Sequence, residues 1–468
     1  MCKKYAKKLK GDVYNMKNIL IIGGSGTWSG KTYIESIKKS DKLVKLVAIM
    51  DFISPYKSKH TKKYCNYFKR NNVKWIEVKN AYEEEILKEC IIKDDIDIVI
   101  ISTPHEFHYK YTLLCLKYGV DVICDKPIIA TPAQSSLEEK AKENICKHNK
   151  LLDAIKKSSN RKLQRKCYVL TPLRRRVQET YTNIYDSVKV IKEQFDQEVS
   201  DITICHNDGV FRFCNEVELN GAHGYTDGFG KLTHTGYHLI DVAAALIENG
   251  CNVKNTECVC KIINCNTIED MIKSKSYDIN ARLLKNKTEK RKVSQIALNA
   301  EMDISISYVL YHNNIKYCSI ILNLMHLGKS NRTMNAYNPT DYNDQGRTNE
   351  LIMHIQQGNL FSAQMISDTK SGSNGTIGYT YTFKNYHPIV AKKIKQKEKE
   401  ILNNTEQAEN TIDIVSEFYN FIANDNLKGH YSYTNFELQR ITNELYMAAL
   451  ISKVTNKEYR WKLGNIKR

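Results

Sequence analysis

Hydrophobic residues in the first third of the chain come in short runs that alternate with amphipathic stretches. The runs are NILIIGG, LVKLVAIMD, DIDIVIIST, VDVICDKP and KCYVLTP. Between them the spacing of apolar residues predicts helices over about 29–40, in HYKYTLLCLKYG and over the charged segment 133–160. Strands that alternate with helices of this length pair in parallel through right-handed crossovers. We therefore predict a doubly wound parallel sheet over residues 17–171.

The pattern changes beyond residue 172, where longer strand-like runs follow one another directly. These runs are SDITICHND, ISISYVLYHNNIKYCSIILNLMH, ELIMHIQQ and IGYTYTFKN, which suit a large, mostly antiparallel open sheet. Two closing helices are predicted over 406–424 and 434–454, the second from the helical spacing of Leu438, Ile441, Leu445 and Ala449. We expect an α/β chain with a basic extension (1–16), a first domain (17–171) and an α+β second domain (172–468). Two polar segments, 266–296 and 328–348, are predicted insertions or loops.

Length and charge narrow the possible functions. A chain of 468 residues is long enough for two hydrophobic cores, in line with the two patterns. The net charge of +18 and clusters such as KNKTEKRK would suit nucleic acid, but the lysines are spread along predicted solvated helix faces. We therefore predict no nucleic-acid partner, and we expect the positive field to favour an anionic cofactor or substrate.

Apolar runs and cysteines indicate the compartment. No run approaches the roughly 20 residues needed to span a bilayer, and the start MCKKYAKKLK has no apolar stretch behind it. Fourteen scattered cysteines then favour a reduced, cytoplasmic protein without membrane attachment. Although four cysteines lie close together in sequence, they form no Cys-x-x-Cys pair, so no metal site is predicted at Cys251, Cys258, Cys260 and Cys265.

The stretch IIGGSGTWSGKT (21–32) can be read as two different phosphate-binding turns. Its end resembles the Gly-Lys-Thr of a nucleotide-triphosphate loop, but that motif needs glycine at the position of Ser25. In the other frame, Gly24-x-Gly26-x-x-Ser29 follows a predicted strand and opens a predicted helix. This context presents backbone amides to a pyrophosphate, with no Cβ in the way. The second frame, a dinucleotide-binding turn, is therefore favoured.

The end of the next predicted strand supports a dinucleotide. Asp51 comes 25 residues after Gly26, where a carboxylate accepts both ribose hydroxyls of NAD and repels a 2′-phosphate. Lys57 and Lys59 leave NADP as an alternative. The predicted cofactor contacts in this part of the chain are Gly24, Ser25, Gly26, Thr27, Trp28 and Asp51.

Three further motifs resemble those of one enzyme family. They are STPHEFH (102–108), GVDVICDKPIIAT (119–131) and GKLTHTGYHLID (230–241). In this order they are similar to the Thr-Pro-x-x-x-His, Glu-Lys-Pro and Gly-x-Leu-x-Asp-x-Gly-x-His-x-x-Asp motifs of the Gfo/Idh/MocA oxidoreductases. The resemblance implies an N-terminal Rossmann domain and a C-terminal domain whose open sheet carries the substrate pocket and often the homo-oligomer interface. It also implies hydride transfer between NAD(P) and a secondary hydroxyl of a sugar, cyclitol or nucleotide sugar.

Roles for individual residues follow from this resemblance. Lys126 corresponds to the catalytic lysine, His238 to the acid/base, and Pro127 is expected after a cis peptide bond. The resemblance implies further cofactor contacts at Thr103, Pro104, His108, Asp125 and Lys126. For the substrate it implies Arg174, Tyr237 and Asp241.

The motifs depart from the family pattern at two positions. Asp125 replaces the usual glutamate, and His234 replaces an aspartate four residues before His238. Since residues i and i+4 share a helix face, we expect both histidines in the pocket, with His234 also taking part in catalysis. Replacing an anion by an imidazole should lower the basicity of His238.

The same motifs leave two alternatives to a dehydrogenase. Some similar proteins use bound NAD transiently to cleave glycosidic bonds, and others with this fold only sense ligands as transcriptional regulators. Lys126 and His238 argue against a regulator, because sensing a ligand needs no proton transfer.

Overall fold

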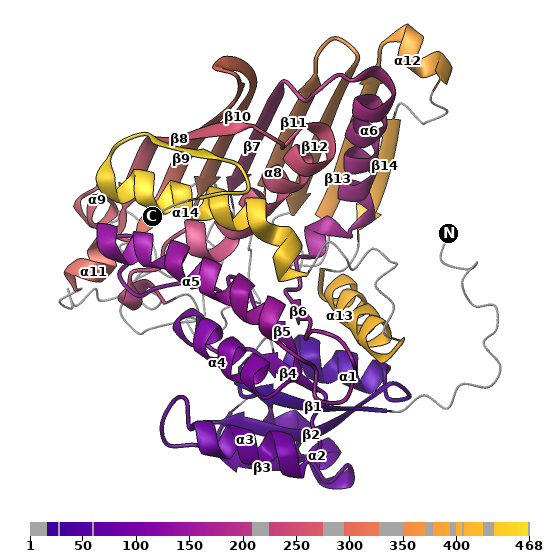
Figure 1. Cartoon of the computed structure of the whole chain (residues 1–468), viewed down its shortest axis with the longest axis vertical. Helices are drawn as coiled ribbons and strands as arrows, with labels where there is room; N and C mark the ends of the chain where they lie inside the picture. Colours follow the sequence, from indigo (N-terminus) through magenta and orange to yellow (C-terminus); the bar gives the residue numbers. More distant parts are fainter. Residues whose placement is uncertain are drawn as a thin grey trace.

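The computed structural model describes residues 16–26, 29–58, 60–207, 224–274, 294–326, 350–369, 378–393, 399–404, 407–424 and 435–466. The predicted fold class is confirmed, because a parallel sheet with helices on both faces is joined to a larger, mostly antiparallel sheet (Figure 1). Thr27, Trp28 and most of the two predicted insertions lie outside the described residues. No helix among the described residues is long and apolar enough to cross a membrane.

The first sheet has six strands in the order β3-β2-β1-β4-β5-β6, and every neighbouring pair is parallel. Its strands are β1 (Lys17–Ile22), β2 (Val44–Asp51), β3 (Lys74–Glu77), β4 (Ile98–Ile101), β5 (Asp121–Cys124) and β6 (Val169–Leu170). The strand order reverses between β1 and β4, and doubly wound sheets bind ligands at the carboxyl ends of strands at such a point. The glycine turn follows β1 and the STPHEFH motif follows β4, so both flank this position.

Burial on both faces explains why these strands read as continuous apolar runs. All four residues of β4 and all four of β5 are buried. The connecting helical segments are η1 (Ser29–Ile34), α1 (Glu35–Lys39), η2 (Lys62–Tyr64), α2 (Cys65–Arg70), α3 (Glu84–Lys93), α4 (His105–Lys117) and α5 (Glu138–Lys157). The predicted helix over 29–40 begins as a π-helical turn and becomes α-helical only at Glu35.

The second sheet has nine strands in the order β14-β13-β12-β11-β7-β10-β9-β8-β15. Within the described ranges its pairs are antiparallel except β7 with β10, which run parallel. The strands are β7 (Asp201–Asn207), β8 (Glu257–Thr267), β9 (Glu301–His312), β10 (Ile315–Met325), β11 (Glu350–Gln357), β12 (Phe361–Thr369), β13 (Gly378–Tyr386), β14 (Lys399–Asn404) and β15 (Tyr459–Lys462). In β9 and β10 buried residues alternate with partly exposed ones, as expected where helices cover only one face.

The helical segments of the second half are short turns and four longer helices. They are η3 (Arg174–Arg176), α6 (Glu179–Phe195), η4 (Tyr225–Asp227), η5 (Leu232–Gly236), α8 (Tyr237–Gly250), α9 (Ile268–Lys273), α11 (Gln295–Leu298), α12 (Pro388–Lys393), α13 (Gln407–Asn424), η7 (Phe436–Gln439) and α14 (Arg440–Thr455). The predicted apolar face of the last helix is wrong at its first residue, because Leu438 lies in the 3-10 turn η7 and is 50% exposed. The α-helix itself begins two residues later.

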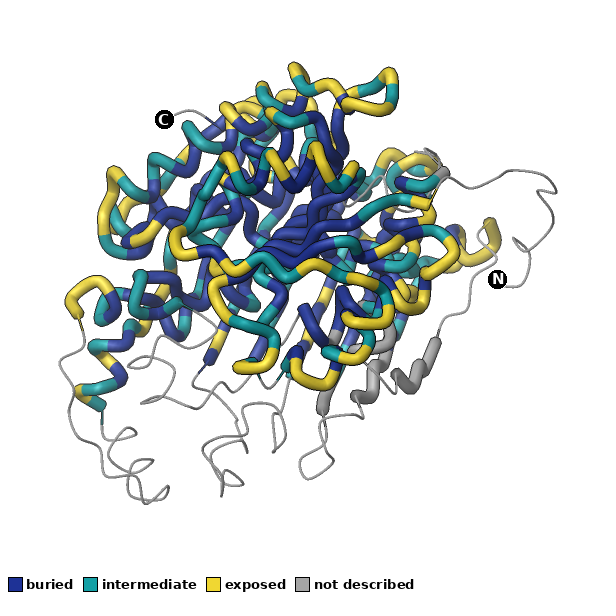
Figure 2. Tube along the Cα trace, turned by 90° about the horizontal axis from the view of Figure 1, so that it is seen from below, coloured by how far each residue is buried: buried dark blue, intermediate teal, exposed yellow. Residues whose placement is uncertain are grey.

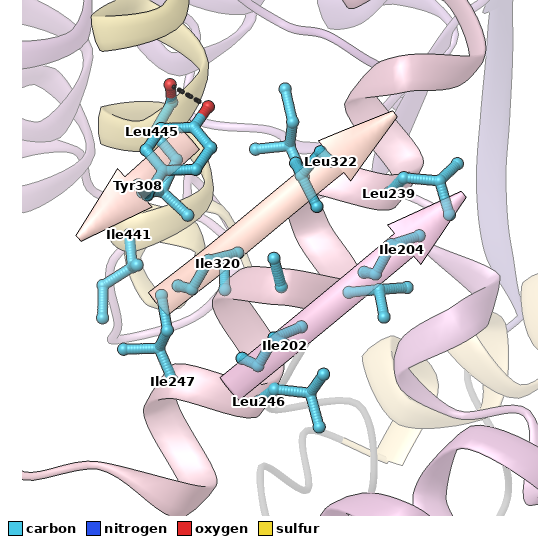
Figure 3. Packing of buried hydrophobic residues seen from close by; sticks show 14 of the residues in the cluster. Ile202, Ile204, Leu239, Leu246, Ile247, Tyr308, Ile320, Leu322, Ile441 and Leu445 are labelled. Atoms are coloured by element: carbon cyan, nitrogen blue, oxygen red, sulfur yellow. Dashed lines mark hydrogen bonds between the residues drawn. The ribbon is translucent and has the colours of Figure 1, made fainter. Parts of the chain in front are cut away.

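Helices α6, α8 and α14 cover one face of the second sheet and form its core. Figure 3 shows Ile202 and Ile204 of β7 and Ile320 and Leu322 of β10 packed against α8. The hydroxyl of Tyr308 also donates to the carbonyl oxygen of Leu445 in α14 at 2.9 Å. Each fully buried side chain of this kind contributes roughly 1.5–3 kcal/mol to folding, so α8 is held firmly against the sheet.

Two helices tie the two halves of the chain together. Ala141 and Ile145 of α5 belong to the core of the second sheet, whereas Leu151 and Ile155 of the same helix belong to that of the first. Helix α13 comes from the second half of the chain but packs beside α1 on the first sheet (Figure 1). Figure 2 shows the result, a continuous band of buried chain through the molecule with exposed residues around it.

Candidate functional site

The glycine turn after β1 brings the backbone close to β4 and leaves one side open. Gly23 has φ of 85°, and a Cβ at this position would lie 2.4 Å from the carbonyl oxygen of Ser102. The hydroxyl of Ser29 donates to the Gly23 carbonyl oxygen at 2.6 Å and fixes the turn. At Gly26, by contrast, an added Cβ would meet no heavy atom nearer than 3.8 Å. The turn therefore has the open backbone surface that a diphosphate needs.

Asp51 ties the end of β2 to this turn. Its Oδ2 accepts the backbone N–H of Ser25 at 2.7 Å, and its Oδ1 accepts the N–H of Ile53 at 3.0 Å. A carboxylate oxygen has two lone pairs, so each oxygen retains one for a ribose hydroxyl. Lys57 is exposed, and Lys59 lies outside the described residues. The residues present thus fit an adenine dinucleotide with a free ribose diol, which is NAD.

His108 joins two of the sequence motifs. The Lys126–Pro127 peptide bond is cis, as expected from the resemblance. The ring of His108 is fully buried, with Nδ1 at 2.8 Å from the Pro127 carbonyl oxygen and Nε2 at 2.8 Å from that of Thr103. Burial lowers the pKa of His108, although Asp125 and the two carbonyl groups favour the charged ring. With both ring nitrogens bound to carbonyl groups, His108 positions the Asp-Lys-Pro turn and does not make the cofactor contact that we expected. Pro104, another predicted contact, is the N-cap residue of α4.

The aspartate that replaces glutamate is held by two hydroxyl groups. Tyr33 of η1 donates to Oδ1 of Asp125, and Ser102 donates to Oδ2 at 2.8 Å. Burial raises the pKa of Asp125, and burial together with this carboxylate raises the pKa of Tyr33. Asp125 therefore links the glycine-turn helix to the Asp-Lys-Pro turn. Sequence reasoning missed Tyr33, which no motif marks.

Lys126 reaches from the first sheet to the turn that precedes α8. Its Nζ donates to the carbonyl oxygen of Thr233 at 3.4 Å and to that of His234. Burial lowers the pKa of His238 well below its ordinary value, and Lys126, Arg175, Arg174 and His206 lower it further. Of the predicted residues, the structure thus brings together Lys126, Arg174 and His238. Because its pKa is lowered, the ring of His238 is neutral at pH 7.

The expectation that His234 and His238 share one helix face is wrong. The segment Leu232–Gly236 is a π-helical turn, and His234 has non-helical angles (φ −83°, ψ −107°). The His234 ring is buried, and its Nε2 lies 3.0 Å from the carbonyl oxygen of Phe229. It contacts a cluster of rings formed by His105, Tyr225 and His326. We therefore assign the ring of His234 to packing and keep only its carbonyl group, which binds Lys126, for the site.

Two predicted substrate contacts are occupied by the protein itself. Asp241 is fully buried, and its Oδ1 accepts Arg176 Nε at 2.7 Å and the Thr442 hydroxyl at 2.8 Å. Tyr237 is also buried and donates to Asn443 Oδ1 at 2.9 Å. These contacts leave neither side chain for a substrate. They fix α8 against η3 and α14, a role that the family motif did not indicate.

A buried lysine that no motif singled out fixes another histidine near the site. Lys231 is fully buried, with its Nζ at 3.3 Å from His206 Nδ1 and 3.0 Å from the Met325 carbonyl oxygen. An ammonium at Lys231 only donates, so in this contact Nδ1 accepts and the ring N–H is on Nε2. His206 is therefore a hydrogen-bond donor of fixed orientation beside His238.

The described residues contain no group of three or more histidine, cysteine, aspartate or glutamate side chains that could hold a metal ion. The twelve cysteines in these residues are all free thiols.

Comparison with known proteins agrees with this geometry. Residues 17–148 match the Gfo/Idh/MocA family, described as an oxidoreductase family with an NAD-binding Rossmann fold. A D-xylose 1-dehydrogenase (NADP(+)) of Hypocrea jecorina is 40% identical over 55 residues, 12% of this chain and 14% of that protein. An inositol 2-dehydrogenase of Rhodococcus erythropolis is 43% identical over 49 residues, 10% of this chain and 14% of that protein. The matched stretch thus spans about a seventh of the length of each relative.

Similarity over the whole chain is seen at the level of structure. A levoglucosan dehydrogenase solved in complex with NADH superposes with a TM-score of 0.57 at 11% sequence identity, and the match covers 96% of this chain and 100% of that one. At this identity the likeness shows the fold alone. It extends the shared architecture beyond residue 148 to the second sheet.

Proposed function

We propose that this protein is an NAD(P)-dependent dehydrogenase, because residues 17–148 match the Gfo/Idh/MocA oxidoreductases, a family with an NAD-binding Rossmann fold. Its substrate is a sugar, cyclitol or nucleotide sugar with a reactive secondary hydroxyl group. The observation that carries the proposal is the reach of Lys126 from the first sheet to the carbonyl groups of Thr233 and His234, just before His238. This contact supports a single site that includes the lysine and the histidine of two distant motifs.

The cofactor half of the proposed site holds NAD. The open backbone at Gly26 binds the diphosphate, while Gly24 packs against Ile49 to hold the turn, and Asp51 accepts the hydroxyls of the adenosine ribose. The His108 and Asp125 contacts keep the Asp-Lys-Pro turn at the carboxyl end of β5. Bound NAD supplies a hydride acceptor, or as NADH a donor, at its nicotinamide ring.

The remaining residues handle the proton of the reacting hydroxyl. His238 is neutral at pH 7, so its ring accepts that proton during oxidation and returns it during reduction. The ammonium of Lys126 donates a hydrogen bond to the same oxygen, which stabilises the charge that develops there. Positioned acid–base groups of this kind contribute about 10²- to 10⁴-fold to a rate.

We test the function with purified protein, NAD or NADP, and a panel of sugars, cyclitols and nucleotide sugars, following nicotinamide absorbance at 340 nm. Lys126→Met is expected to lower kcat by about 10²- to 10³-fold, because it removes the donor that stabilises the charge on the reacting oxygen. The Kd for NAD, measured by calorimetry, should change less than about threefold, since the diphosphate and ribose contacts remain.

Lys150→Met is the matched control, because Lys150 is an exposed residue of α5. Unchanged activity of Lys126→Met would contradict the proposal, as would failure of the native protein to bind either dinucleotide. Release of a monosaccharide without accumulation of NADH would identify glycoside cleavage instead.

A further inference from the structure

We propose that Gln134 positions Lys126 for catalysis by holding Thr233, the residue whose carbonyl group binds the lysine ammonium. The inference rests on the proposed function, since it adds a positioning residue to the same site. Gln134 lies just beyond the segment GVDVICDKPIIAT (119–131) and was not among the residues that the motifs indicated.

One connection of the first half of the chain binds Thr233 at two points. Lys126 Nζ donates to the Thr233 carbonyl oxygen at 3.4 Å, and Gln134 Nε2 donates to the Thr233 hydroxyl at 2.8 Å. Both donors lie between the end of β5 and the start of α5, whereas Thr233 lies in the π-helical turn η5. Two contacts from one connection, one to the backbone and one to the side chain, fix both the place and the orientation of this residue.

All four hydrogen-bonding positions of the Gln134 amide are used. Its Oε1 accepts the backbone N–H of Thr131 and an amide N–H of Asn144, each at 2.9 Å. A backbone N–H only donates, so Oε1 faces Thr131 and Nε2 faces Thr233. Gln134 is fully buried, and its Nε2 also donates to the Tyr446 hydroxyl at 2.6 Å. The side chain therefore cannot turn away from Thr233 without leaving buried polar groups unpaired.

The partners of Gln134 anchor it to both halves of the chain. Asn144 lies on α5, where its Oδ1 accepts the Thr131 hydroxyl at 2.6 Å. Tyr446 lies on α14, which runs beside α5 (Figure 1), and its hydroxyl is 3.0 Å from that of Thr233. All of these residues are buried. A buried network whose groups are paired is rigid, so the packing of α5 against α14 sets the position of Thr233.

The residues before Thr233 are fixed by the second sheet. The N–H of Leu232 donates to Oε1 of the buried Glu301 at 3.1 Å, and that of Lys231 donates to the Glu301 carbonyl oxygen at 2.8 Å. Gly230 lies directly against this glutamate, since a Cβ there would be 2.4 Å from its Cδ. Strand β9, which begins at Glu301, thus holds residues 230–232. Gln134 then couples the connection that carries Lys126 to this fixed turn.

The proposed reaction needs such a coupling. Lys126 and His238 act on one oxygen but come from different halves of the chain. Misplacing a catalytic group by about 1 Å can lower a rate by about 10²-fold. A contact that holds the lysine to the turn just before His238 therefore acts on kcat more than on the binding of either ligand.

The first test needs neither cofactor nor substrate. The partly exposed Lys126 is acetylated with an N-hydroxysuccinimide ester of acetic acid, and the rate is followed by peptide mass spectrometry. Thr233→Val removes the hydroxyl that Gln134 binds and keeps the size of the side chain. Acetylation should become about fivefold faster, because an amine that is held less firmly turns toward the reagent more often. Thr233→Ser, which keeps the hydroxyl, should restore the slower rate.

Thr256→Val is the matched control. Thr256 is fully buried, and its hydroxyl lies 3.2 Å from that of Tyr317, as the Thr233 hydroxyl lies 3.0 Å from that of Tyr446. Thr256 follows the end of α8 that is opposite to His238. Loss of its hydroxyl should therefore leave the acetylation of the site lysine unchanged.

Two further variants assign the effect to Gln134. Gln134→Met should raise the acetylation rate at least as much as Thr233→Val. Because this variant also leaves Asn144 unpaired, Thr233→Val decides if it does not fold. Tyr446→Phe keeps the contact between Gln134 and Thr233 and should change the rate less than about twofold.

Kinetics with the sugar that is oxidised best provide the second test. Thr233→Val should lower kcat by about tenfold and change KM and the Kd for NAD by less than about threefold. In a Lys126→Met background the same substitution should change kcat by less than about twofold, because the group that it positions is gone. A purely structural role of Thr233 would lower kcat equally in both backgrounds.

Failure of this inference can be told apart from failure of the proposed function. An acetylation rate that is unchanged in Thr233→Val, or that rises as much in Thr256→Val, overturns the inference, as does an equal loss of kcat in both backgrounds. If no sugar is oxidised, the proposed function falls, and the acetylation rates alone decide whether Gln134 positions Lys126.

Discussion

The two halves of the site are held in place by different physical means. The Asp-Lys-Pro turn is fixed by hydrogen bonds from segments that flank the first sheet, namely from Tyr33, Ser102 and His108. Helix α8, which carries His238, is fixed by buried ion pairs to Arg176 and by hydrogen bonds to α14. Removing a hydrogen-bonding hydroxyl costs far less than leaving a buried charge unpaired, so the second half should be the more sensitive one.

Breaking the ion pairs of α8 gives the largest expected effect. Arg176→Met leaves the buried carboxylate of Asp241 and the half-buried one of Glu248 without their cation and should lower the free energy of unfolding by about 3–5 kcal/mol. Urea denaturation at pH 7 measures this loss. Arg70→Met, at an exposed position, should change it by less than about 0.5 kcal/mol. A loss below about 1 kcal/mol in Arg176→Met would remove the distinction between the halves.

The helix that connects the halves should give a smaller effect that depends on pH. His148 of α5 is buried against Phe436, and burial lowers its pKa to about 4, well below the roughly 6.5 expected in the unfolded chain. The folded state then binds this proton less readily than the unfolded state. The associated stability is complete above pH 6.5 and falls as the pH drops toward 4, by roughly 2 kcal/mol at pH 5.

His148→Leu checks this effect. The variant should lose less unfolding free energy than the native protein between pH 7.5 and pH 5, by roughly 2 kcal/mol. His238 and His108 also have lowered pKa values, but they are present in both proteins and cancel in the difference. His354→Gln, at an exposed position of β11, should keep the native pH dependence. Parallel curves for His148→Leu and native protein would show that His148 is not buried in the neutral form.

The hydroxyl of Tyr33 should give the smallest effect, on the first half. Tyr33→Phe removes one of the two hydroxyl groups that bind Asp125 and should cost about 1.5 kcal/mol in unfolding free energy. Tyr308→Phe is a matched comparison, because that buried hydroxyl donates to the neutral carbonyl oxygen of Leu445 and should cost about 1 kcal/mol or less. Urea denaturation measures both losses. An equal or larger loss in Tyr308→Phe would mean that Asp125 gains nothing from Tyr33.

The sequence predicted the first sheet well because its strands are buried on both faces. Continuous apolar runs marked β1, β2, β4 and β5, and their order along the chain implied parallel pairing. Strand β3 (Lys74–Glu77) was not predicted, since KWIE has only two apolar residues at the sheet edge. Strand β8 (Glu257–Thr267) was missed as well, because buried residues occupy only its first part.

Local motifs also predicted the cofactor half of the site, but not the buried contacts that hold the site in place. The glycine turn, Asp51 and Lys126 lie in short patterns whose chemistry can be read directly. Arg176 and Asp241 are 65 residues apart, and no local pattern shows that they pair. The π-helical turn at His234 is likewise a departure that helical periodicity cannot express. Contacts over long separations therefore account for what the sequence did not reveal.

The return of α13 to the first sheet has a consequence for how this architecture can be divided. Ile414, Val415, Phe418 and Tyr419 cover apolar surface beside α1 that the first 171 residues alone would leave in water. A dinucleotide-binding cassette cut at that boundary would expose this patch and associate through it. The two halves of the chain are therefore expected to fold together and to be transplanted only as a single piece.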